Sequence, residues 1–181
     1  CRKNELSWFY QKGASEIFPE EFDLYQSVIP ENERGDLIRA FYSRLTSEDR
    51  SERAKAAYAW TRWEMSTSFL LPKELSIKKA ANDIFSDSFA RIECHYFINN
   101  IFLEDNYILK NITKIKNIPV SVVQGRYDIV CPMRSAWDLK QSLASIKLYV
   151  IDMAGHSMKE TGITNKLIEL TGEVANNLSN I

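Results

Sequence analysis

Val120–Pro132, with the sequence VSVVQGRYDIVCP, is the stretch that decides the fold. A short run of β-branched apolar residues follows Pro119 and stops at Gly125, which predicts a buried strand. Gly125 lets the backbone turn after the strand, and Asp128 then projects from a loop. Pro132 suits the first turn of a helix. The stretch therefore predicts a strand, a loop and a helix in succession.

A matching arrangement follows 28 residues after Asp128. Lys147–Asp152 predicts a second strand, and Met133–Leu143 predicts the helix between the two strands. His156 follows the end of the second strand, in the sequence Ala-Gly-His-Ser. Two strands joined by a crossover helix are parallel, so their carboxyl ends share one edge of the sheet. Open α/β sheets place their chemistry at that edge. We therefore expect Asp128 and His156 to face each other.

The chain before Phe102 reads as a block of helices. Pro19 and Pro30 each predict a helix start, and Ser47 is a good N-cap before a long helix that carries Trp60 and Trp63. A further helix is expected over residues 87–99, and a last one over 163–178. Two strands cannot form a covered parallel sheet alone, so we expect a partner segment outside this chain.

Composition excludes several classes of protein. The 23 basic and 24 acidic residues leave a net charge of −1, which argues against nucleic acid or an anionic membrane as the partner. No apolar run reaches the ~18–20 residues of a membrane span. Cys1, Cys94 and Cys131 make neither a metal pattern nor a disulfide framework. We therefore expect reduced thiols in a cytoplasmic protein, and no metal.

Asp128 and His156 are the residues best suited to chemistry. A histidine at a strand end can act as general base and then acid, while the aspartate holds its tautomer. The alternative is a capping histidine beside an aspartate that makes an Asx turn, and the spacing alone leaves both open. The order Asp then His matches the second and third members of the Ser-Asp-His triad of α/β-hydrolases. His95 lies within a predicted helix and reads as a core or surface residue.

Glu64 and Glu93 each fall inside an apolar helical stripe, where an unpaired carboxylate is costly to bury. Glu93 shares its stripe with Ile92 and Tyr96. The simplest interpretation pairs the two glutamates with Arg62 and Arg91, or lets them reach solvent at the rim of the stripe.

Several segments resemble proline iminopeptidases, which are α/β-hydrolases with a lid domain. They are Gly125–Pro132, Ala136–Leu139, Ala154–Ser157, Trp8–Gln11, Arg34–Leu37, Trp63–Glu64 and Arg91–Glu93. The resemblance covers nearly the whole chain. It implies an α/β fold in which residues 1–105 form a mostly helical lid and residues 106–181 form the C-terminal part of the hydrolase core, with its last parallel strands and helices. The chain starts at Cys1 rather than Met, which the resemblance explains as the C-terminal part of a longer protein.

By this resemblance Asp128 and His156 are catalytic, and Glu64 and Glu93 accept the free α-ammonium of a peptide substrate with an N-terminal proline. No Gly-x-Ser-x-Gly occurs in the chain, so the nucleophilic serine is expected upstream of Cys1. No organic cofactor is implied.

Two alternatives stay open. One is a lidded hydrolase that acts on other amides or esters. The other is a truncated or inactive homologue that serves as a helical binding module. In the second case the exposed strand edges favour pairing with another copy, as a homo-oligomer.

Overall fold

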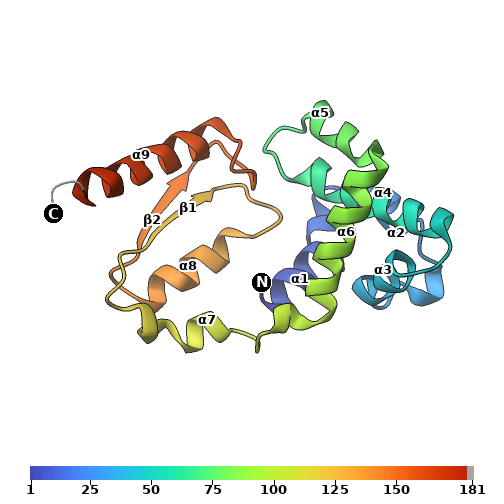
Figure 1. Ribbon diagram of the computed structural model, residues 1–181, viewed down its shortest axis with the longest axis horizontal. Coiled ribbons are helices and arrows are strands. Elements are labelled where there is room, and N and C mark those ends of the chain that lie inside the picture. The colour runs from blue at the N-terminus through green and yellow to red at the C-terminus, as the bar shows by residue number, and fades with distance from the viewer. Residues whose placement is uncertain (179–181) are drawn as a thin grey trace. The chain divides into compact units, whose positions relative to one another are not determined.

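The computed structural model describes residues 1–178 (Figure 1). The chain separates into two compact units. The first unit comprises Cys1–Thr67 and Pro72–Asp105. The second comprises Ser68–Leu71 and the chain from Asn106 onward. Nothing in the sequence predicts that the four residues 68–71 leave the helical unit.

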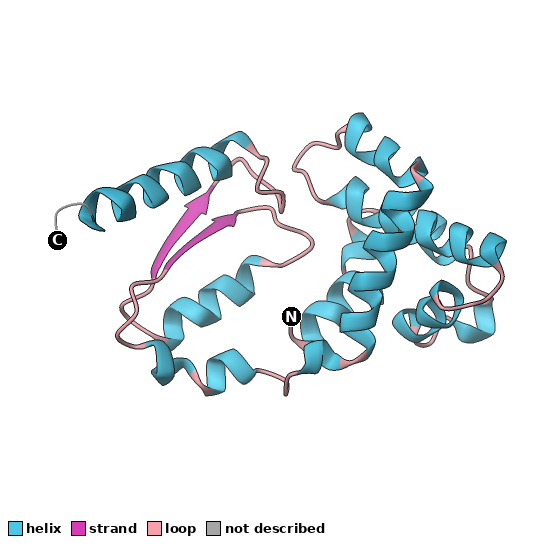
Figure 2. Cartoon of the chain, in the orientation of Figure 1, coloured by secondary structure: helices cyan, strands magenta, loops and turns pink. Residues whose placement is uncertain are grey.

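The second unit is built on two parallel strands, β1 (Ser121–Gly125) and β2 (Lys147–Ile151). The strands pair in register from Ser121 opposite Lys147 to Gly125 opposite Ile151. Helix α8 (Met133–Ser142) connects them, and α9 (Thr161–Leu178) follows β2. The two helices lie on opposite sides of the strands (Figures 1 and 2). The parallel pair predicted from the sequence is confirmed, although β2 ends one residue before Asp152.

A short helical stretch leads into β1. Helix α7 (Tyr107–Lys110) is followed by a 3₁₀ turn, Ile112–Ile115. The mixed helical chain with its small parallel sheet is compatible with the C-terminal portion of an α/β-hydrolase.

The two loops that leave the carboxyl edge of the sheet are in backbone contact. Tyr127 N donates to Ala154 O at 3.0 Å, and Arg126 N donates to Ile151 O at 2.9 Å. A Cβ atom on Gly125 would lie 1.9 Å from Gly155 O, closer than atoms can approach. Gly125 is therefore required by this close approach of two backbones.

The first unit is a helical bundle with an aromatic core. Its helices are α1 (Lys3–Tyr10), α2 (Pro19–Gln26), α3 (Leu37–Leu45), α4 (Arg50–Thr67), α5 (Glu74–Ile77) and α6 (Asp83–Ile98). Short 3₁₀ turns are found at Ala14–Glu16, Glu31–Glu33, Lys78–Ala81 and Asn100–Phe102. Trp60 and Trp63 of α4 have no exposed surface. Around them pack the aromatic rings of the other helices, namely Phe9, Tyr10, Phe22, Tyr25, Phe41 and Phe97.

Two predicted helix starts are wrong. Pro30 begins only a 3₁₀ turn, and α3 starts at Leu37 because the Asp36 carboxylate accepts a hydrogen bond from Arg39 N at 3.0 Å. Asp49 rather than Ser47 caps the long helix α4, accepting from Ser51 N at 2.8 Å. In both places the side chain nearest the first helical N–H groups supplies the cap.

The last helix of this unit, α6, begins earlier and buries a different face than predicted. The Asn82 side chain accepts from Phe85 N at 2.9 Å, so the helix starts at Asp83 rather than near residue 87. Its buried residues are Ser86, Ala90 and Cys94, four apart along one face. The large residues of the predicted stripe are partly exposed, with Ile92 at 60% and Tyr96 at 48%. Small side chains let α6 pack closely on α4, which explains the difference.

The backbone contact at Gly125 makes a testable prediction. Gly125→Ala should lower the free energy of unfolding by about 3 kcal/mol, the upper end for forced overpacking, because the new methyl group meets carbonyl oxygens. Gly172→Ala in α9 is the matched control, since a Cβ atom there meets nothing within 4 Å. It should raise stability by about 1 kcal/mol through helix propensity. Urea denaturation measures both, and equal effects of the two substitutions would contradict the prediction.

Candidate active site

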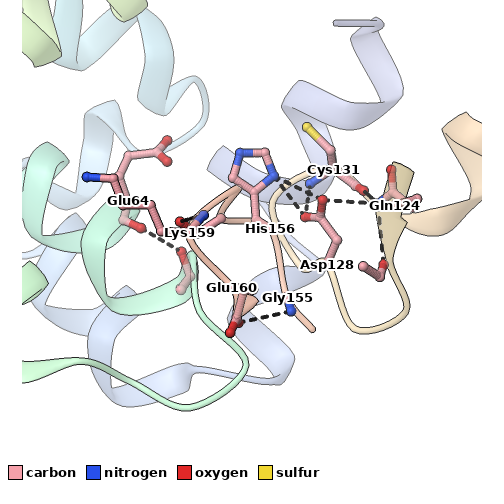
Figure 3. A network of polar contacts seen from close by, with 11 residues as sticks. Glu64, Gln124, Asp128, Cys131, Gly155, His156, Lys159 and Glu160 are labelled. Carbon is pink, nitrogen blue, oxygen red and sulfur yellow. Dashed lines mark hydrogen bonds and ion pairs between the residues drawn. The ribbon is translucent and has the colours of Figure 1, made fainter. Parts of the chain in front are cut away.

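The side chains of Asp128 and His156 meet at the carboxyl edge of the sheet. Asp128 follows β1 by three residues, and His156 follows β2 by five. His156 Nδ1 lies 2.9 Å from Asp128 Oδ2 and 3.2 Å from Oδ1 (Figure 3). With Nδ1 donating to the carboxylate, the neutral ring carries its acceptor lone pair on Nε2. The pair thus has the arrangement of an aspartate that orients a general base.

Asp128 is buried, and its carboxylate is held from the side opposite the histidine. Cys131 N donates to Oδ1 at 2.7 Å, and Gln124 Nε2 donates to Oδ2 at 3.0 Å. Figure 3 shows Asp128 between His156 on one side and the Gln124 and Cys131 groups on the other. Hydrogen bonds to an ionised carboxylate offset part of the cost of removing it from water. The sequence predicted Asp128 but gave no role to Gln124.

The backbone of the His156 loop is held by residues 68–71. Ser68 O accepts hydrogen bonds from His156 N at 3.0 Å and Ser157 N at 2.8 Å. The Glu160 carboxylate accepts from Leu70 N at 2.6 Å and Gly155 N at 3.1 Å. Three of these hydrogen bonds therefore tie the loop that carries the histidine to residues 68–71, and the fourth, from Gly155 N to Glu160, lies within the loop. No sequence signal points to this contact, because any carbonyl group can accept.

Glu64 and Glu93 lie on neighbouring helices of the first unit, beside one pair of stacked rings. The rings of Tyr10 and Trp60 are stacked with centroids 4.6 Å apart. The Tyr10 hydroxyl donates to Glu64 Oε1, and Trp60 Nε1 donates to Glu93 Oε2 at 3.0 Å. Glu64 is 4% exposed. Each glutamate is thus oriented by a neutral aromatic donor.

The arginines that could have paired with these glutamates bind other acids. Arg62 forms a two-point ion pair with Glu21, at 2.7 and 2.9 Å. Arg91 pairs with Asp87 at 3.2 Å on the same helix. The simple interpretation in which Arg62 neutralises Glu64 and Arg91 neutralises Glu93 is therefore wrong.

The remaining candidate residues have other surroundings. His95 is exposed on α6. Cys1, Cys94 and Cys131 are thiols rather than disulfides. Burial, followed by the charges of Glu93 and Asp36, raises the pKa of Cys94 to about 12. Among residues 1–178, no cluster of three or more His, Cys, Asp or Glu side chains could hold a metal ion. No helix in this part of the chain is long and apolar enough to cross a bilayer.

The buried phenols near Glu64 have strongly shifted pKa values. Burial, followed by the charges of Glu64 and Glu93, raises the pKa of Tyr10 well above its usual value. Burial is also the main cause that raises the pKa of Tyr25, with smaller contributions from Cys94 and Glu64. Both phenols therefore stay neutral in the folded state at pH values where the unfolded chain ionises them.

This shift predicts a loss of stability in alkali. A phenol whose pKa is raised by folding stabilises the fold fully below its unfolded pKa, about 10, and loses this effect as the pH rises toward the folded value. Two such groups should lower the free energy of unfolding by about 2.7 kcal/mol per pH unit above pH ~10. Tyr25→Phe should halve that slope. It should cost little at pH 7, since the Tyr25 hydroxyl is buried without a hydrogen-bond partner.

Urea denaturation between pH 8 and about 11 measures the slope. Tyr127→Phe is the control, because this phenol is 54% exposed. A slope unchanged by Tyr25→Phe, or changed equally by Tyr127→Phe, would contradict the prediction.

Comparison with known proteins adds to this geometry. No family model matches the chain. It is 52% identical over 171 residues to a probable proline iminopeptidase of Leptolyngbya boryana, which covers 94% of this chain and 53% of that protein. It is 46% identical over 169 residues to a proline iminopeptidase of Arabidopsis thaliana, covering 92% of this chain and 44% of that protein.

A more distant relative is the proline iminopeptidase of Neisseria gonorrhoeae, with 36% identity over 177 residues, 96% of this chain and 55% of that protein. The chain spans about half the length of the curated relatives it matches. The resemblance first noted in the short motifs thus extends over nearly all of the chain, which is similar throughout to proteins named proline iminopeptidase.

Proposed function

We propose that these residues form part of a serine aminopeptidase that releases N-terminal proline from peptides. The observation that carries the proposal is the hydrogen bond between Asp128 and His156 at the ends of neighbouring parallel strands. α/β-Hydrolases place their acid and base in this chain order. The names of the relatives support a prolyl substrate. In this proposal residues 1–105 are the lid domain, and residues 106–181 are the C-terminal part of the hydrolase core.

The proposed reaction needs a serine that lies outside these 181 residues. Its hydroxyl attacks the carbonyl carbon of the proline residue, and His156 Nε2 takes the hydroxyl proton. Asp128 stabilises the imidazolium that forms. His156 then gives this proton to the leaving amine as the C–N bond breaks. Water then attacks the resulting prolyl ester while His156 takes a proton from it, and His156 returns this proton to the serine oxygen as the ester C–O bond breaks and proline leaves.

Glu64 and Glu93 are proposed to bind the free ammonium group of the substrate. Tyr10 and Trp60 are neutral donors, so they orient the two carboxylates without cancelling their charge. Carboxylates in a largely dry site bind a cation through charge-assisted hydrogen bonds. An internal peptide bond offers no such cation, which would restrict cleavage to the first residue of a peptide.

Two substrates and one substitution test the anchor. The intact protein should hydrolyse prolyl p-nitroanilide, and N-acetylation of the proline should strongly lower kcat/KM because it removes the cation. Glu93→Gln should lower kcat/KM for the free prolyl substrate by about 10- to 100-fold, the effect of one hydrogen bond to a charged group. It should leave the acetylated substrate nearly unaffected, so the ratio between the two substrates shrinks.

Glu169→Gln is the matched control, because Glu169 forms an exposed ion pair with Lys166 on α9. Asp128→Asn should lower kcat by about ten-thousandfold, as expected for a triad acid. Hydrolysis of both anilides at similar rates would refute the ammonium anchor. Failure of the intact protein to hydrolyse either anilide would refute the peptidase and favour the binding-module alternative.

A further inference from the structure

Gln124 spans the loop that carries Asp128. It is the penultimate residue of β1, and its side chain reaches across to the far end of the loop. Nε2 donates to Asp128 Oδ2 at 3.0 Å and to Cys131 O at 3.0 Å, with a longer contact of 3.5 Å to Gly125 O. One primary amide thus links the strand, the carboxylate and the residue before Pro132.

A carboxamide side chain fits the hydrogen-bond acceptors around position 124. A primary amide nitrogen carries two N–H groups, which match the two acceptors at 3.0 Å. A glutamate of the same shape has no N–H donor and would place a second negative charge beside Asp128. A methionine of similar length has no donor at all.

Gln124 also decides how the Asp128 carboxylate is rotated. Oδ1 accepts from Cys131 N at 2.7 Å, and Oδ2 accepts from both Gln124 Nε2 and His156 Nδ1. With one donor fixed on each oxygen, the carboxylate plane is held with Oδ2 toward the imidazole. Without Gln124 the Cys131 N–H would be the one donor besides His156 itself, so the carboxylate would be freer to rotate and turn Oδ2 away from the imidazole.

We propose that Gln124 is the positioning residue of the Asp128–His156 pair. Its amide bridges the two ends of the loop and holds Oδ2 of Asp128 toward His156 Nδ1. The catalytic consequence rests on the proposed function. The geometric one does not, so the two can be tested separately.

The first experiment observes the hydrogen bond itself by proton NMR. A strong Nδ1–H···O hydrogen bond gives a low-field imidazole proton signal, assigned in the intact protein by its loss in His156→Gln. Gln124→Met should move this signal upfield or abolish it. Gln141→Met, the same change on the exposed face of α8, should leave it unchanged. An unchanged signal in Gln124→Met, in protein that melts as the wild type does, would overturn the proposal.

A second variant guards against simple misfolding. Gln124→Glu should weaken the signal at neutral pH, where two carboxylates would repel each other. Lowering the pH lets the pair share a proton, and the protonated glutamate can then donate to Asp128, so the signal should recover relative to the wild type at the same pH. Other charged groups near this loop include His156, the Arg126–Asp152 pair at 3.9 Å, and the Arg134–Asp138 pair at 2.8 Å on α8. A signal that stays weak at every pH would count against the donor role.

The second experiment measures catalysis by the intact protein on prolyl p-nitroanilide. Gln124→Met should lower kcat about tenfold, the effect of one hydrogen bond to a charged group, with KM nearly unchanged. An interaction that matters only when the imidazolium forms lowers kcat and kcat/KM equally. An unchanged kcat in active protein would overturn the positioning role. If the wild type hydrolyses no prolyl substrate but the NMR signal depends on Gln124, the proposed function fails and the positioning of Asp128 stands.

Discussion

The parallel pairing of β1 and β2 is the constraint on which the candidate site depends. Register places Gly125 opposite Ile151, so both strands end together at one edge. Beyond that edge the pairing continues, as Arg126 N donates to Ile151 O at the end of β2 and Tyr127 N donates to Ala154 O in the loop that follows. The missing side chain of Gly125 allows this approach. Asp128 and His156, far apart in sequence, can meet only because their loops leave the sheet side by side.

In both units, acids that are buried or partly buried accept hydrogen bonds from neutral donors. Asp128 accepts from an amide and a backbone N–H, Glu64 from a phenol and Glu93 from an indole. These donors are neutral, so they reduce the cost of burial and fix the orientation of each carboxylate, yet leave its negative charge in place. Arginine partners would have cancelled that charge. Arg62 and Arg91 are instead occupied by Glu21 and Asp87. An acid held in this way can still bind a cation. At Asp128 that cation is the imidazolium of His156, and in the proposed role of the glutamates it is an ammonium group.

Elements that depend on neighbouring residues were predicted well from the sequence, whereas helix caps and buried faces, which depend on three-dimensional geometry, were not. The strands and α8 were predicted well, because β-branched runs, Gly125 and Pro132 act on their own neighbours. Helix starts at Pro30 and Ser47 were wrong, because several nearby side chains could cap and only the geometry of the turn chose Asp36 and Asp49. The buried face of α6 was also misjudged. Hydrophobicity favoured its large residues, but close packing on α4 selected the small ones.

The sequence by itself determined that an aspartate and a histidine follow two successive parallel strands, and its motifs pointed to the family. It also marked Glu64 and Glu93 as acids out of place in apolar stripes. Only the tertiary structure decided which partners these groups have: Gln124 for Asp128, Ser68 for the His156 loop, and aromatic donors for the glutamates. The physical reason is the range over which each effect acts. Backbone preferences and periodicity are local properties of a few residues, whereas a hydrogen bond depends on tenths of an ångström between segments that only the complete fold brings together.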